Sequence, residues 1–287
     1  MHLAKLLDSV GEPAVGVVEG DAVEVLDLRD APFRDLNALL TLSPAELAAT
    51  VRALPRRGER FPVDRAGLLP PIDRQEVWAA GVTYKRSQTA RMEESEAAKD
   101  CYDRVYQSPR PELFFKATPY RVRGTGQALR IRQDATWNVP EPELALVLNP
   151  RLEIVGYTIG NDMSSRDIEG ENPLYLPQAK VYDQCCGLGP WITLAEAMPP
   201  HDQIGISLRV LRHAEVAFEG ATSVAEMARK FDELVGWLGR DNTFPHGAFL
   251  LTGTGIVPDS DFTLAAGDRI EIRIDGIGAL INEVVQA

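Results

Sequence analysis

The stretch Trp137-Asn-Val-Pro-Glu-Pro-Glu-Leu-Ala-Leu-Val-Leu148 decides how the rest of the chain is interpreted. Residues i and i+2 of an extended segment point to the same face, so the carboxylates of Glu141 and Glu143 lie side by side. The flanking prolines favour an extended path, and the apolar run 144–148 predicts a buried strand. A cation between the two carboxylates would remove their repulsion and the cost of burying them, and Mg²⁺ prefers such oxygen ligands. A solvated, proline-rich loop before a strand fits this stretch equally well.

A second strand is predicted over Glu153–Met163, and it ends in a polar turn. Asp162 lies at its end, where a third oxygen ligand can converge with the two glutamates. Asn and Asp are also ordinary turn residues, so this position alone does not decide between the two roles. Lys180 follows in a stretch with few charges. A lysine near a metal can move protons or hold a carboxylate, although most lysines lie at the surface.

Several motifs, in this order, resemble the fumarylacetoacetate hydrolase superfamily. They are Glu141-x-Glu143, Gly156-Tyr-Thr-Ile-Gly-Asn-Asp-Met-Ser-Ser-Arg-Asp167, Gln178-Ala-Lys180, Gly187-Leu-Gly-Pro-Trp191, Leu250-Leu-Thr-Gly-Thr-Gly255 and Ala266-Gly-Asp-Arg-Ile-Glu-Ile272. The resemblance implies that Glu141, Glu143 and Asp162 bind Mg²⁺ or Mn²⁺. It also implies that Lys180 is the basic residue near the substrate and that Thr254 contacts the substrate's carboxylate.

One segment departs from the hydrolases of this superfamily. They usually carry Gly-x-Asn-Tyr, then a His and, three residues later, a Glu, and this pair activates water. Here the segment reads Gly81-Val-Thr-Tyr-Lys-Arg-Ser-Gln-Thr-Ala90, with Ser87 in place of the His and Ala90 in place of the Glu. A serine hydroxyl is not a base near neutral pH without a partner of its own. Hydrolysis by the usual pair is therefore not expected.

The residues present instead resemble a subgroup that acts on 2-keto-3-deoxy sugar acids, including the 2-keto-3-deoxy-arabinonate dehydratases. This resemblance rests on Ala90-Arg-Met-Glu-Glu-Ser95, Arg110-Pro-Glu-Leu-Phe-Phe-Lys116 and Asn172-Pro-Leu-Tyr-Leu-Pro-Gln-Ala-Lys180. It implies that Glu112 is an added acid–base group. The candidate substrate contacts are Ser87, Arg91, Lys116, Gln178 and Thr254.

Dehydration of a 2-keto-3-deoxy acid needs a metal, a base, an acid and groups that bind hydroxyls. The metal polarises the keto group, a C3 proton leaves, and the C4 hydroxyl departs with help from an acid. Tautomerisation then gives a semialdehyde, and no nucleophilic water is needed. We expect Lys180 and Glu112 to transfer the protons, without an assignment of which is base and which is acid.

Length, charge and cysteine content limit the class of protein. A chain of 287 residues that is 45% hydrophobic can bury a sizeable core. Its net charge of −12 argues against nucleic acid and against an anionic membrane surface. No apolar run approaches the ~20 residues of a membrane span, and no N-terminal signal is evident. The three cysteines, an odd and low number, predict a cytoplasmic protein, with Cys185 and Cys186 packed beside the site and not bonded.

The predicted fold is α+β, with a large mixed β-sheet rolled around the metal and a small N-terminal domain. The expected boundaries are residues 1–72 for the N-terminal domain and 73–287 for the catalytic domain. In the N-terminal part we predict a hairpin of Ala14–Val18 and Ala22–Leu26, two short helices over 35–53 with Ser43 as an N-cap, and a solvated loop at Arg56–Arg60. The segment 85–108 is predicted to be helical and mobile, within a lid of 85–112. A further helix is predicted over 223–240, with an apolar stripe of Met227, Phe231, Leu234, Val235 and Leu238.

The leading hypothesis is a metal-dependent dehydratase of a 2-keto-3-deoxy sugar acid, a pentonate that yields 2,5-dioxopentanoate. Two alternatives stay open: hydrolysis of a carbon–carbon bond in a diketo acid, and a sugar-acid-binding protein without catalysis. The expected partners are the small 2-keto acid and, because similar proteins are usually homodimers, a second copy of the chain.

Overall fold

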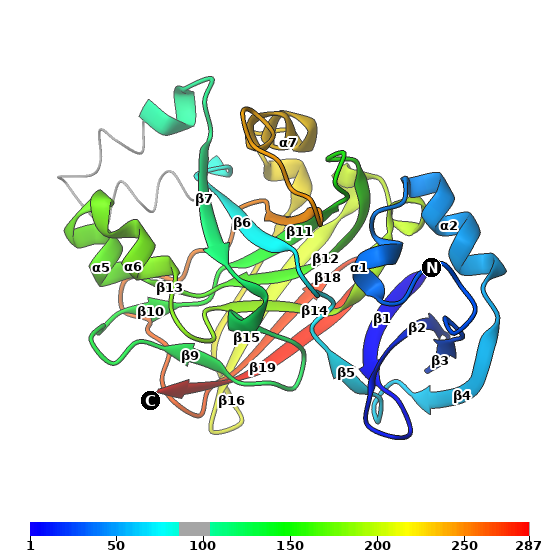
Figure 1. The fold of residues 1–287 in the computed structure, drawn as a ribbon. Coiled ribbons are helices and arrows are strands. Elements are labelled where there is room, and N and C mark those ends of the chain that lie inside the picture. Colours follow the sequence, from blue (N-terminus) through cyan, green and yellow to red (C-terminus); the bar gives the residue numbers. More distant parts are fainter. Residues whose placement is uncertain (86–103, 287) are drawn as a thin grey trace.

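The computed structural model describes residues 1–85 and 104–286. Ser87, Arg91 and most of the helix expected over 85–108 lie outside these ranges, and residues 104–107 are helical. Two curved sheets form most of the molecule, with short helices at its periphery (Figure 1). Within the described ranges, none of the helices has the length and apolar character that a membrane span requires.

The main sheet has 12 strands and runs through the middle of the molecule. Its order is β4-β3-β2-β1-β14-β12-β11-β17-β6-β7, with β5 on β1 and β8 on β14. The bounds are β1 His2–Leu7, β2 Pro13–Glu19, β3 Ala22–Leu26, β4 Arg56–Pro62, β5 Gly67–Leu69, β6 Glu76–Gly81, β7 Glu112–Ala117, β8 Val122–Arg123, β11 Pro142–Leu148, β12 Ile154–Asp162, β14 Cys186–Leu194 and β17 Ala248–Leu251. The β6–β17 and β8–β14 pairs are parallel and the others antiparallel, so the sheet is mixed, as predicted.

A second sheet of five strands packs against the middle of the first. Its order is β16-β15-β18-β19-β9, and β10 pairs with β13 separately. The bounds are β9 Leu129–Ile131, β10 Asn138–Val139, β13 Ser164–Ser165, β15 Gly205–Arg212, β16 Glu215–Ser223, β18 Arg269–Ile274 and β19 Gly278–Gln286. The largest apolar core lies between the sheets and joins Leu144 and Leu146 of β11 to Leu208 of β15 and Ile272 of β18. The α+β class is confirmed.

The remaining elements are short helices on the outside of the sheets. The bounds are α1 Leu36–Leu39, α2 Pro44–Ala53, α5 Arg166–Glu171, α6 Leu176–Lys180 and α7 Phe231–Leu238, with 3₁₀ turns η1 Pro119–Arg121, η2 Pro173–Tyr175, η3 Ala195–Ala197, η4 His201–Gln203 and η5 Val224–Glu226. The predicted N-cap of α2 is confirmed, because the Ser43 side chain accepts from the Glu46 amide while the Glu46 carboxylate accepts from the Ser43 amide.

The N-terminal strands extend the main sheet, because β1 pairs with β14. The predicted hairpin is confirmed as β2 and β3. The loop predicted at Arg56–Arg60 is wrong, since these residues begin β4, the last strand at this edge of the sheet. An edge strand tolerates charged side chains because one of its sides faces solvent. The charged residues of Arg56–Arg60 were therefore mistaken for a loop.

The helix predicted over 223–240 is also wrong in its first half. Ser223 does accept a hydrogen bond from Ala225, but it caps only the 3₁₀ turn η5, and α7 begins at Phe231. Between them Met227 forms a β-bridge with Tyr84, and the Ala228 amide donates to the Thr83 carbonyl. These contacts with a distant segment replace helical hydrogen bonds. Phe231, Leu234, Val235 and Leu238 are buried, as the stripe predicted.

Candidate active site

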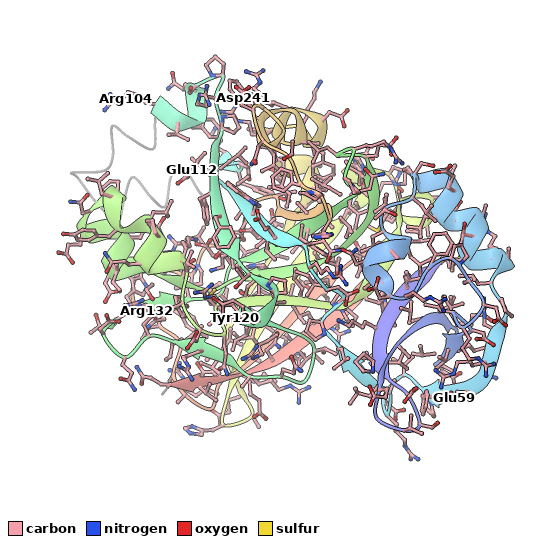
Figure 2. The ribbon with its side chains drawn as sticks, viewed as in Figure 1. Glu59, Arg104, Glu112, Tyr120, Arg132 and Asp241 are labelled. Atoms are coloured by element: carbon pink, nitrogen blue, oxygen red, sulfur yellow. The ribbon has the colours of Figure 1, made fainter. Side chains whose placement is uncertain are left out.

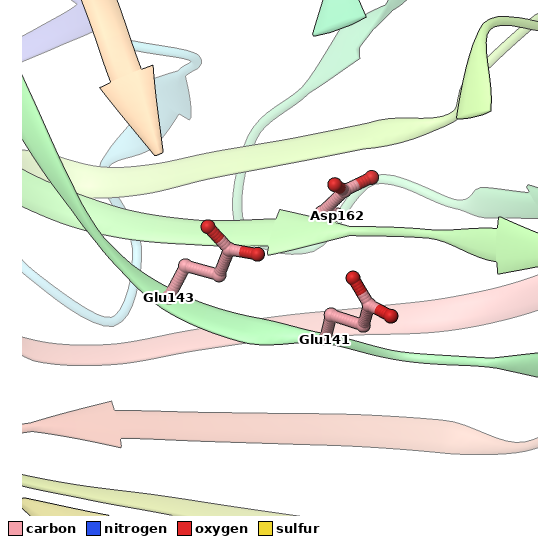
Figure 3. Close-up of side chains that lie close together, drawn as sticks. All are labelled: Glu141, Glu143 and Asp162. Carbon is pink, nitrogen blue, oxygen red and sulfur yellow. The ribbon is translucent and has the colours of Figure 1, made fainter. Parts of the chain in front are cut away.

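The pairing of β11 with β12 brings three carboxylates to one point. Glu143 lies opposite Gly160 and Pro142 opposite Asn161, so Glu141 and Asp162 meet where the two strands part. The Asp162 amide donates to the Glu141 carbonyl, which fixes this last step of the register. The three side chains lie close together (Figure 3), and one oxygen from each lies within 4.8 Å of the others. We call Glu141, Glu143 and Asp162 the carboxylate site.

Cationic side chains and a backbone amide surround this site. Lys180, at the end of α6, donates from Nζ to Glu141 Oε2 at 2.6 Å, to Ser164 Oγ at 2.6 Å and to Asp162 Oδ2 at 3.3 Å. Arg166, the first residue of α5, donates from Nη2 to Glu141 Oε1 at 2.7 Å. The Gly253 amide donates to Glu143 Oε2. Both oxygens of Glu141 are thus held by cations, which fixes the orientation of its carboxylate.

Lys116 is a further cation that contacts the carboxylate site. It is fully buried on β7, its Nζ forms an ion pair with Asp162 Oδ1, and it donates to the carbonyls of Met163 and Lys180. Burial is the largest single influence and would lower the pKa of Lys116, but Asp162, Cys185 and Cys186 together outweigh it and hold that pKa above its usual value. Lys116 is thus a buried counter-ion with its ammonium beside three oxygens, and its expected contact with the substrate stays a prediction.

Charged side chains of both signs surround the site. Among the described residues, five carboxylates line the cavity, namely Glu112, Glu141, Glu143, Asp162 and Glu169. Lys116, Lys180 and Arg166 form ion pairs with two of them, Glu141 and Asp162. Burial, Asp162 and Glu141 raise the pKa of Glu143 well above its ordinary value, so its ionised form needs further positive charge.

The donor set and the space also fit Mg²⁺ or Mn²⁺. All three side chains offer hard oxygen atoms, and these metals prefer such ligands. The whole cavity, which Glu112, Phe114 and Thr254 also line, has a volume of about 20 Å³, enough for a single ion or water molecule. A larger cavity of about 450 Å³ lies between α1 and the N-terminal strands, but its lining contains no such group of carboxylates.

The other predicted residues divide into two groups. Glu112 and Thr254 line the same cavity as the carboxylate site, and Figure 2 shows Glu112 where β7 begins, beside the end of β6. Thr254 lies in the turn after β17 and exchanges hydrogen bonds with the backbone of Ile256. Gln178 is exposed and does not line the cavity.

Three residues near the site were not singled out from the sequence. Arg166 and Glu169 are buried, lie three residues apart on α5 and line the cavity. Ser164 is buried in β13 and accepts from Lys180. The available signal was the i, i+3 spacing of an arginine and a glutamate directly after the Asp162 strand, which places both on one helix face. Cys185 and Cys186 are free and buried, as predicted.

Comparison with known proteins identifies the family. The family model for the fumarylacetoacetate (FAA) hydrolase C-terminal domain matches residues 76–285. The chain belongs to this family. It is 52% identical over 222 residues to a probable 2-keto-3-deoxyxylonate dehydratase of Haloferax volcanii, covering 77% of this chain and 76% of that one. It is 44% identical over 227 residues to the 2-dehydro-3-deoxy-D-arabinonate dehydratase of Saccharolobus solfataricus, covering 78% and 76%.

A solved structure of the same family carries the ligands that the site suggests. It is a 2-keto-3-deoxy-D-arabinonate dehydratase complexed with magnesium and 2,5-dioxopentanoate. This chain is similar to it with a TM-score of 0.84 and 35% sequence identity, over 100% of this chain and 99% of the other. The resemblance noted in the motifs therefore extends over the whole fold.

Proposed function

We propose that this protein is a Mg²⁺-dependent dehydratase that converts a 2-keto-3-deoxy pentonate to 2,5-dioxopentanoate. The observation that carries the proposal is the buried carboxylate site with Lys180 bonded to two of its members. The family members at 44% and 52% identity and the magnesium complex support the same reaction.

The metal ligands in this proposal are Glu141, Glu143 and Asp162. A bound Mg²⁺ would polarise the keto group of a 2-keto acid and so make the C3 proton easier to remove. We place the carbon chain of the substrate beside Glu112, Phe114 and Thr254, which line the same cavity as the ligands.

In this proposal two groups of the chain move protons. Lys180 reaches the carboxylate site from α6, with its ammonium 5.6 Å from the centre of the Phe114 ring. Glu112 approaches from β7. Loss of a proton from C3 and of hydroxide from C4, which takes up a proton, releases one water molecule. We assign these two transfers to Lys180 and Glu112, and we retain Thr254 as a contact of the substrate's carboxylate.

The test is turnover of a panel of 2-keto-3-deoxy pentonates and hexonates, with Mg²⁺ and with a chelator, followed by mass spectrometry. We expect a product lighter by one water from a pentonate, and no product after chelation. Cleavage to pyruvate and a smaller fragment would instead support carbon–carbon bond chemistry. Binding without any product would indicate a sugar-acid-binding protein.

Deuterium at C3 of the substrate separates the two proton-transfer roles. A variant that lacks the base does not exchange this deuterium with solvent. A variant that lacks the acid exchanges it without losing water. The matched pair for this experiment is Lys180→Met and Glu112→Gln, each expected to lower kcat by about 10²–10⁴-fold. Full turnover by either variant would remove that residue from the mechanism.

We also propose that the protein works in the cytoplasm as a homodimer. Its two described cysteines are free thiols, which suits a reducing compartment. Homodimers are usual among similar proteins. Light scattering during size-exclusion chromatography tests the homodimer, and a monomeric mass at micromolar concentration would contradict it.

A further inference from the structure

The residue opposite Glu112 in the sheet has no side chain. β6 and β7 are antiparallel neighbours, and Gly81 at the end of β6 pairs with Glu112 at the start of β7. The carboxylate of Glu112 lies over the Gly81 backbone. A Cβ atom at position 81 would be 2.0 Å from Glu112 Oε2 and 2.6 Å from Glu112 Cδ. The carboxylate thus occupies the space that a side chain at position 81 would need.

This glycine is needed for space and not for its backbone angles. Its φ is not positive, so an L-residue fits the backbone there without strain. Gly253, which follows the neighbouring strand β17 and also lines the cavity, is different, because its φ is 90° and an added Cβ would meet Thr83 Oγ1 at 2.0 Å. Substitution at Gly253 would therefore strain the backbone, whereas substitution at Gly81 disturbs mainly one flexible side chain.

We propose that Gly81 is a positioning residue that holds the Glu112 carboxylate in the active site. The inference rests on the proposed function, since it gives Glu112 a proton to transfer. The bare backbone of Gly81 lets the carboxylate lie across the end of β6, into the cavity that also contains Lys180 and Asp162. A methyl group at position 81 displaces the carboxylate by rotation of the Glu112 side chain, which leaves the sheet intact.

The first experiment is Gly81→Ala with a matched control, Gly236→Ala. Gly236 is exposed in α7, and an added Cβ there meets no atom within 4 Å. A misplacement of about 1 Å can cost about 10²-fold in rate, so we expect kcat of Gly81→Ala to fall by that order while KM changes little. The temperature of unfolding should match that of the wild type. Gly236→Ala should keep full activity.

A double-mutant cycle with Glu112→Gln shows whether Gly81 acts through Glu112. Gly81→Ala should lower kcat in the wild-type background and have no further effect in the Glu112→Gln background. An equal loss in both backgrounds would overturn the inference, as would full activity of Gly81→Ala beside an inactive Glu112→Gln. Unfolding of Gly81→Ala would also contradict it, because rotation of one side chain should relieve the contact. Full activity of Glu112→Gln would instead reject the proposed role of Glu112 itself.

Discussion

Two parts of the main sheet bury very different groups: the N-terminal end of its strand order, and the carboxylate end, where the central strands β11 and β12 part. At the N-terminal end, β1–β3 and α2 bury apolar side chains such as Leu3, Val23 and Leu47, while the charged groups lie mostly at the surface. At the ends of β11 and β12 the same sheet buries Glu141, Glu143 and Asp162. Burial of charge costs stability unless other charges compensate it. The comparison indicates that the N-terminal end contributes to stability, and that the carboxylate end is maintained for its chemistry at a cost in stability.

The largest effect should come from Glu143→Gln. Loss of one metal ligand should lower kcat/KM by about 10³-fold, because a metal that polarises a carbonyl is worth several kcal/mol. In metal-free protein the same change should raise the free energy of unfolding at pH 7, since it removes a buried charge whose pKa is raised by burial and by its carboxylate neighbours. Kinetics and urea unfolding after chelation measure both effects. A fall in both kcat/KM and the free energy of unfolding would mean that Glu143 stabilises the protein, and would contradict the comparison.

Lys116→Met should be the most destabilising change at the carboxylate end. It leaves Asp162 as a buried charge without its closest cation, and the expected loss is about 3–5 kcal/mol in the free energy of unfolding. The control is Arg52→Met, which removes an exposed pair with Glu196 and should cost about 0–1 kcal/mol. Equal losses in urea unfolding would mean that burial does not distinguish the two ion pairs.

Leu47→Ala should lower stability and leave catalysis unchanged. Leu47 on α2 is fully buried in the core that joins the N-terminal helices to the sheet. The cavity left by its truncation should cost about 2–5 kcal/mol in the free energy of unfolding. At a temperature where the variant is folded, kcat and KM should equal those of the wild type. A change in KM would mean that packing at the N-terminal end of the sheet affects substrate binding at the site.

The smallest effect should come from Ser43→Ala, which removes the N-cap of α2. The expected loss is about 1 kcal/mol at neutral pH. The hydrogen bonds from the Ser43 hydroxyl and amide lower the pKa of Glu46, so their contribution is present above the ordinary pKa of a glutamate and is lost as the pH falls through the lowered value. The difference between variant and wild type should therefore shrink in acid, as unfolding at pH 7 and pH 3 would measure. A constant difference would mean that the bond from the Ser43 hydroxyl to the Glu46 carboxylate contributes nothing.

The same contrast explains what the sequence predicts well. The hairpin of β2 and β3, the capped helix α2 and the buried strand β11 follow local rules of alternation, capping and apolar runs. The three residues of the carboxylate site were found because two of them lie two residues apart at the start of a strand. Where local rules and distant contacts compete, the prediction fails, as at Met227 and Ala228, which pair with Tyr84 and Thr83.

The side chains around the ligands were harder to predict. Lys116 and Lys180 both contact Asp162, yet one has its ammonium enclosed by three oxygens and the other reaches the cavity. Nothing in the local sequence separates these roles, because they depend on the direction from which β7 and α6 approach the site. Arg166 and Gly81 matter through a single partner each, Glu141 and Glu112, and that partner is visible only in three dimensions.

One Mg²⁺ titration with two readings tests the central claim most directly. Chelator-treated wild-type protein receives increasing Mg²⁺, and each sample is measured for its free energy of unfolding and for dehydration of a 2-keto-3-deoxy pentonate. We predict that both rise over the same concentration range, with about 2.7 kcal/mol of added stability at 100 times the dissociation constant. Full turnover in the presence of chelator, or stabilisation without any turnover, would contradict the account.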